Sequence, residues 1–136
     1  MLTDKLIIDN NSLISEFLGF KKELFYQCSP DEDKSVWQDK DFGFYDLPFS
    51  GGYDMAGKEG VWFAQTQLKF HSDWNWLMPV IKKIESMGFY VSIMKSNITC
   101  CKDGGISPVF EEYDYNDKLE TTWLAVTAFI KWYNKQ

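Results

Sequence analysis

The chain has 136 residues, of which 45% are hydrophobic, and its formal net charge is −6 at pH 7. This length and apolar content suit one folded domain over residues 1–136 and exclude a disordered chain. All fourteen basic residues are lysine. Because arginine is the side chain that reads phosphates and base edges with two parallel donors, its absence and the acidic balance argue against sequence-specific nucleic-acid binding.

The sequence offers neither a membrane segment nor a secretion signal. No apolar run is long enough to cross a bilayer, and the start MLTDKLIIDNN lacks a basic stretch followed by a long apolar one. The three cysteines, Cys28, Cys100 and Cys101, are an odd number and do not resemble a disulfide framework. We therefore expect a cytoplasmic protein with reduced thiols.

Three segments have the apolar periodicity of helices: 11–20, about 73–87, and a stretch within 115–136. Each has, at or just before its start, a residue able to cap its first turn. The candidates are Asn11 or Ser12, then Ser72, then Asn116 or Asp117. The first two end at a glycine, Gly19 and Gly88. The expected buried positions are Leu13, Ile14, Phe17 and Leu18, then Leu77, Val80, Ile81, Ile84 and Met87, then Leu119, Trp123, Val126, Ile130 and Tyr133.

Strands are expected between and before the later helices. Residues 89–95 alternate apolar and polar side chains and are followed by 96–102, which predicts a hairpin. Residues 106–113 predict a third strand, weakened or placed at an edge by Pro108, and another strand lies within 61–70. The fold class is therefore α+β, an antiparallel sheet packed with helices.

Several of these segments together resemble a known family. The opening NSLISEFLGF, the stretch LKFHSDWNWLMPVIKKIES, the hairpin and the closing AVTAFIKWYN are similar to the small phage and prophage proteins of the phage ABA sandwich domain. The resemblance covers both ends and residues 66–101, whereas residues 21–60 look like an aromatic and glycine-rich elaboration. It implies a mobile-element origin, a layered α/β/α sandwich, the host cell cytoplasm as location, and no established enzymatic activity, so no catalytic residues carry over.

The stretch GGYDMAGKEG at 51–60 has Gly52, Gly57 and Lys58 at the spacing of a phosphate-binding loop. In such a loop a serine or threonine hydroxyl follows the lysine and holds magnesium, and a helix then begins. Here Glu59 takes the hydroxyl position, where its carboxylate would repel phosphates, and Gly60 follows. We interpret the stretch as a flexible connection.

Other chemical motifs also fail at the residues that they require. Residues 39–50 miss both the glycine and the glutamate of a calcium loop. Cys28, His71 and Asn75 have the types of a nucleophile, a base and an orienting amide, but no local signature around Cys28 supports a catalytic thiol. The acidic run 111–114 is typical of a solvated face. We predict no cofactor, no metal and no catalytic residue; if there is an enzymatic activity, hydrolysis is the class least disfavoured.

Aromatic residues make up 18% of the chain and include six tryptophans. Trp76 shares a helix face with Pro79 and Lys83, and proline inside a helix is best tolerated on the solvent side. Trp76 is therefore expected to be partly exposed, or covered by residues 37–63. The candidate interaction or ligand surface consists of Trp76, Pro79, Lys83, His71, Trp62 and Tyr53.

Two functions remain open. The leading hypothesis is a non-enzymatic accessory protein that binds a host or phage protein or forms a homo-oligomer, and it predicts an exposed apolar patch around Trp76 and Pro79. The alternative is a binder of a small, nucleotide-like molecule. It predicts an enclosed aromatic pocket with a lysine such as Lys58 or Lys69.

Overall fold

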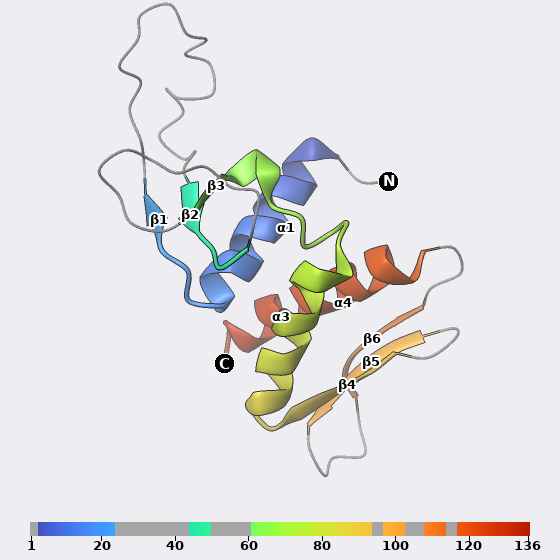
Figure 1. Cartoon of the computed structure of the whole chain (residues 1–136). Helices are drawn as coiled ribbons and strands as arrows, with labels where there is room; N and C mark the ends of the chain where they lie inside the picture. Colours follow the sequence, from blue (N-terminus) through green and yellow to red (C-terminus); the bar gives the residue numbers. More distant parts are fainter. Residues whose placement is uncertain (1–2, 24–43, 50–60, 94–96, 103–107, 114–116) are drawn as a thin grey trace, which may run out of the picture. The chain divides into compact units, whose positions relative to one another are not determined.

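The computed structural model describes residues 3–23, 44–49, 61–93, 97–102, 108–113 and 117–136. The chain forms two compact units, Met1–Leu68 and Lys69–Gln136, and Figure 1 draws the helices and strands of each. The single domain expected from the sequence stays a prediction, as does the elaboration at 21–60, most of which lies outside the described residues.

In the first unit, helix α1 runs Asp4–Phe17. It begins well before the predicted start, because Thr3 is the cap: its Oγ1 accepts a hydrogen bond from the backbone N–H of Leu6 at 3.2 Å. The prediction of Asn11 or Ser12 as the cap is wrong. The prediction of Gly19 as the stop is confirmed, since Gly19 has φ 86° and the N–H of Phe20 donates to Ser15 O at 3.0 Å.

A small antiparallel sheet follows α1, in the order β1-β2-β3. It consists of β1 (Lys22–Glu23), β2 (Phe44–Asp46) and β3 (Trp62–Ala64), and a 3-10 helix η1 (Gln65–Gln67) comes next. The strand predicted within 61–70 is confirmed as β3, although it is short. Strands β1 and β2 were not expected.

The middle of α1 buries polar side chains. Asn10, Asn11 and Ser15 are all buried, whereas Ile14 is the one fully buried member of the predicted apolar stripe. Asn11 Nδ2 donates to Leu68 O at 3.0 Å, and Gln65 Nε2 donates to the hydroxyl of Ser12 at 2.9 Å. The hydroxyl of Ser15 has no hydrogen-bond partner among the described residues. Hydrogen bonds therefore join apolar burial in positioning helix α1.

The second unit contains two longer helices. Helix α3 runs Trp74–Ser86 and is capped by Asp73, whose carboxylate accepts a hydrogen bond from the backbone N–H of Asn75 at 2.8 Å. The cap is therefore one residue after the predicted Ser72. Gly88, with φ 92°, follows the end of α3 as predicted. Helix α4 runs Lys118–Tyr133 and is capped by Asp117, as one of the two alternatives had it. Neither these helices nor the described residues of α1 have the length and apolar character needed to cross a membrane.

The sheet of this unit is antiparallel, in the order β4-β5-β6. The hairpin is confirmed: β4 (Phe89–Ile93) pairs with β5 (Asn97–Lys102), with Val91 opposite Cys100. The third strand, β6 (Pro108–Tyr113), pairs with β5 and lies at the edge, where a proline costs no ladder bond on its outer side. The α+β class is therefore confirmed, and the layered sandwich stays a prediction.

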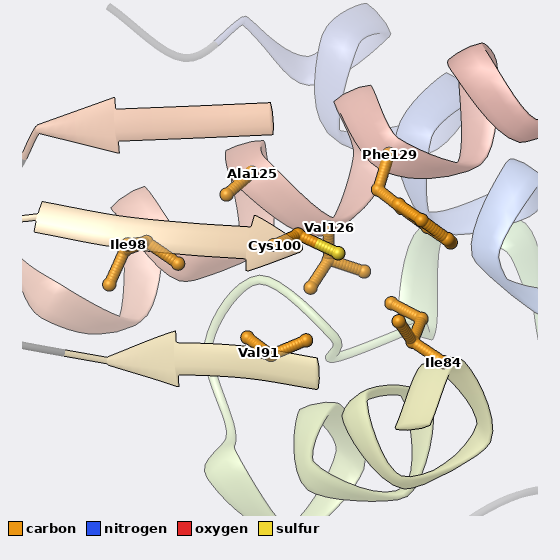
Figure 2. Close-up of a pocket in the computed structure, with 7 residues that line it drawn as sticks. All are labelled: Ile84, Val91, Ile98, Cys100, Ala125, Val126 and Phe129. Carbon is orange, nitrogen blue, oxygen red and sulfur yellow. The ribbon is translucent and has the colours of Figure 1, made fainter. Parts of the chain in front are cut away.

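The core of this unit lies between the sheet and the helices. Figure 2 shows side chains from α3, β4, β5 and α4 turned toward one another around a narrow gap. The seven that line it are Ile84, Val91, Ile98, Cys100, Ala125, Val126 and Phe129. All are apolar or weakly polar, so this part of the fold is stabilised by the burial of apolar surface.

Replacing Ser15 with alanine should raise the free energy of unfolding by about 1 kcal/mol. The reason is that a buried hydroxyl without a partner costs about 1–3 kcal/mol and alanine is the better helix former. The thermal midpoint should rise by about 2–5 °C.

Asn11→Ala is the matched control on the same helix and should lower the midpoint, because it leaves the buried Leu68 carbonyl without the donor that it has in the structure. A clear fall in the midpoint of Ser15→Ala would mean that the Ser15 hydroxyl is bonded in the folded protein.

Candidate interaction site

The structure does not present Trp76 on a surface. Its side chain is 4% exposed, and its ring meets Phe70 edge-on with centroids 5.1 Å apart and planes at 80°. Partial exposure, the first of the two expectations for Trp76, is wrong, whereas cover by residues 37–63 stays a prediction because most of that segment lies outside the described residues. An indole is large enough to reach back from the border of a helix's apolar stripe to the residues that precede the helix, and here it does so.

The outer face of α3 holds two of the other predicted residues, Pro79 and Lys83. Pro79 is exposed, as expected for a proline inside a helix, and Lys83 is partly exposed. An open depression on this face is lined by Asn75, Met78, Pro79, Ile81, Lys82 and Glu85. Met78, at 48% exposure, is its main apolar group. Trp76 and Lys83 are not in this lining, so the patch predicted around Trp76 and Pro79 does not form as a unit.

The remaining predicted residues lie elsewhere. His71 precedes α3, is half-buried, and has its ring 5.9 Å from that of Trp123. Burial lowers the pKa of His71 below its ordinary value. Trp62 lies on β3 and is buried. Tyr53 lies outside the described residues, as does Cys28.

The described residues hold no group of three or more His, Cys, Asp and Glu side chains placed to bind one metal ion. Cys100 lies on β5 and is buried in the apolar core. Its surroundings are those of a small apolar residue, and burial of this kind makes a thiol less reactive.

Aromatic side chains of α4 and β4 form a partly exposed surface that the sequence did not predict. Four rings, which we call the aromatic cluster, gather where α4 ends and β4 begins: Phe89, Phe129, Trp132 and Tyr133. Trp132 is 37% exposed and Tyr133 39% exposed, whereas Phe129 is fully buried. The cluster therefore joins the core to the surface.

Helical spacing assembles most of the cluster. Trp132 and Tyr133 follow Phe129 by three and four residues, so both rings lie next to it on α4. Their centroids are 5.8 Å and 6.0 Å from that of Phe129. Phe89 reaches the cluster because Gly88 turns the chain directly from α3 into β4, and its ring is 5.0 Å from that of Phe129.

The exposure of Tyr133 corrects the predicted buried stripe of α4. Trp123, Val126 and Ile130 are buried as expected, Leu119 is half-buried, and Tyr133 lies on the surface. The spacing of four and three is right, but Tyr133 is the last residue of α4. At this end of the helix the ring of Tyr133 stacks on Phe129 but is only partly covered.

One narrow cavity among the described residues of the second unit is too small to bind a ligand. Its volume is about 10 Å³, and its walls are the apolar side chains of Figure 2. A space of this size holds at most one water molecule, and an apolar one stays empty. Of the lysines named for the ligand alternative, Lys69 is exposed and Lys58 lies outside the described residues.

Trp76→Ala should lower the free energy of unfolding by about 3–5 kcal/mol, because it empties a buried ring-sized space and removes the edge contact with Phe70. Urea denaturation measures this. Met78→Ala on the same helix is the control and should change stability by less than about 1 kcal/mol, because the side chain is already half in water. Equal effects of the two changes would contradict the burial of Trp76.

His71 should make the folded protein less stable in mild acid. Because its pKa is lower when folded, the unfolded chain binds the proton more tightly, and stability rises with pH. The stability gained by keeping His71 neutral is fully present above its unfolded pKa of about 6.5. It is lost as the pH falls from there through the lower pKa of the folded protein. Thermal midpoints measured between about pH 5 and 8 should fall less toward acid for His71→Gln than for the natural protein. If the thermal midpoint of His71→Gln falls toward acid as steeply as that of the natural protein, His71 is not a source of the pH dependence.

A scan against protein-family models finds no match, no curated protein matches the chain, and no solved structure matches it. The resemblance to the phage ABA sandwich domain therefore stays a prediction. The side chains on the described surface are what indicate how this protein acts.

Proposed function

We propose that this chain is a non-enzymatic binding protein that engages another protein, or a second copy of itself, through the aromatic cluster. The observation that carries the proposal is the partial exposure of Trp132 and Tyr133 on top of the buried Phe129. Tryptophan and tyrosine are the residues most often found at the energetic centre of protein interfaces.

The support of the exposed rings favours binding. Trp132 contacts Phe89 at a centroid distance of 6.0 Å and Phe129 at 5.8 Å, so its ring is held by two others. A side chain that is already ordered loses little conformational entropy when a partner covers it, and binding is correspondingly tighter.

The resemblance noted from the sequence supports a more specific form of the proposal. Under it the chain is a phage or prophage accessory protein that acts in the host cytoplasm on a host or phage protein. Binding a small, nucleotide-like molecule remains the alternative, to be decided by the same experiment.

Trp132→Ala combined with Tyr133→Ala should abolish retention of the partner. The experiment is native mass spectrometry of the protein after incubation with a lysate of its source cells, which reports bound proteins, copies and small molecules in one spectrum. Truncating hot-spot residues typically costs 2 kcal/mol or more, so affinity should fall by roughly thirtyfold or more. A retained mass of nucleotide size, insensitive to the change, would favour the alternative.

The matched control for stability is Ile130→Val, a buried change on the same helix. It should cost about 0.5–1.5 kcal/mol, comparable to the loss of the ring contacts of Trp132. If Ile130→Val also releases the partner, instability explains the loss and not the surface. If the double variant keeps its protein partner, the aromatic cluster is not the binding site.

A further inference from the structure

We infer that the partner presents an acidic segment to this surface, with carboxylates next to an apolar side chain. The inference rests on the proposed function and adds the chemistry of the partner. It comes from the charges beside the aromatic cluster, which differ in sign from the charge of the whole chain.

Near the cluster, the elements that form it carry lysine and no acidic side chain, because the one acidic residue of α4, Glu120, lies in the first turn of that helix. After Glu120 the chain has no acidic side chain up to Gln136, and its charged residues there are Lys131 and Lys135. Strand β4 contains no charged residue. In a chain with a net charge of −6, the end of α4 is thus a locally positive surface.

Helical geometry places the lysines beside the exposed indole. Lys131 and Lys135 are four residues apart and form one row, and Lys135 follows Trp132 by three residues. The chain keeps winding beyond the end of α4, since the N–H of Lys135 donates to Trp132 O at 3.1 Å and Gln136 Nε2 donates to the same oxygen at 2.9 Å. Trp132 therefore lies between a row of lysines and the row of Phe129 and Tyr133.

This arrangement fits an acidic peptide better than a neutral one. An apolar side chain of the partner would cover the rings of Trp132 and Tyr133, while its carboxylates pair with the exposed ammonium groups of Lys131 and Lys135. At about 150 mM salt the screening length is about 8 Å, so the distant acidic residues of the chain are largely screened and the two lysines dominate. Lysines in the last turn also favour the helix through its dipole, so the test must separate affinity from stability.

The test compares two short synthetic peptides at about 150 mM salt. Each has a central leucine and phenylalanine, flanked by glutamates in one peptide and by glutamines in the other. Binding is followed through the indole N–H signals of the ¹⁵N-labelled full-length protein in two-dimensional NMR, and Trp132→Phe assigns the signal of Trp132. We expect the glutamate peptide to shift that signal and to bind about three to ten times more tightly than the glutamine peptide.

Lys131→Gln combined with Lys135→Gln should remove the difference between the peptides while the thermal midpoint stays within a few degrees. Lys82→Gln, on the exposed face of α3, is the matched control and should leave the difference intact. If both peptides shift the Trp132 signal with equal affinity, the acidic partner is ruled out and the aromatic cluster stands as a binding surface.

Two further outcomes would also overturn the inference. If neither peptide shifts the Trp132 signal, the surface does not recognise acidic segments, and the lysate experiment with the Trp132 and Tyr133 double variant decides the proposed function separately. If a short oligothymidine shifts that signal and binds with higher affinity than the glutamate peptide, the lysines and rings serve single-stranded nucleic acid. Its bases stack on aromatic side chains without regard to sequence.

Discussion

The unit Lys69–Gln136 depends on an uncharged run in α4, residues 121–130. A helix that carries no charge on any face must be covered on several sides, and most of this run is buried. Helix α4 accordingly contacts α3 and the strands β5 and β6. Charged side chains return only at Lys131, where the helix leaves this cover. The position of the aromatic cluster is a direct consequence of where that run ends.

Local signals predicted much of the fold because they act over a few residues. The stops at Gly19 and Gly88, the cap at Asp117 and the hairpin all follow from short-range geometry, and the structure has each of them. The start of α1 could not be predicted in the same way. Its buried asparagines at 10–11 look like a cap in the sequence, since asparagine competes with the helix for backbone hydrogen bonds. Only the tertiary bonds that satisfy the Asn11 side chain reveal that the helix continues through it.

The candidate site was harder to predict because exposure depends on what lies across from a side chain. Spacing along α3 gives the direction in which the Trp76 side chain leaves the backbone. It does not locate Phe70, which precedes the helix and against which the indole packs. Tyr133 fails in the opposite sense: it continues a correct buried stripe to the last residue of α4, where its ring stacks on Phe129 but stays 39% exposed. In both cases the helical period is right, and the exposure of the side chain is decided by residues elsewhere in the fold, which the period does not locate. A lysine row that begins where an uncharged helix ends would have been the better signal.

Phe129 gives the proposed binding surface its rigidity. It is fully buried and belongs to the core wall of Figure 2, yet it also contacts Phe89, Trp132 and Tyr133. An exposed ring that rests on a core residue cannot move freely without disturbing close packing, because protein interiors leave few voids. The surface is therefore preorganised by the same contacts that stabilise the fold. Under the proposal, core changes at Phe129 would alter binding and stability together, whereas changes at Lys131 and Lys135 would alter recognition with little effect on the core.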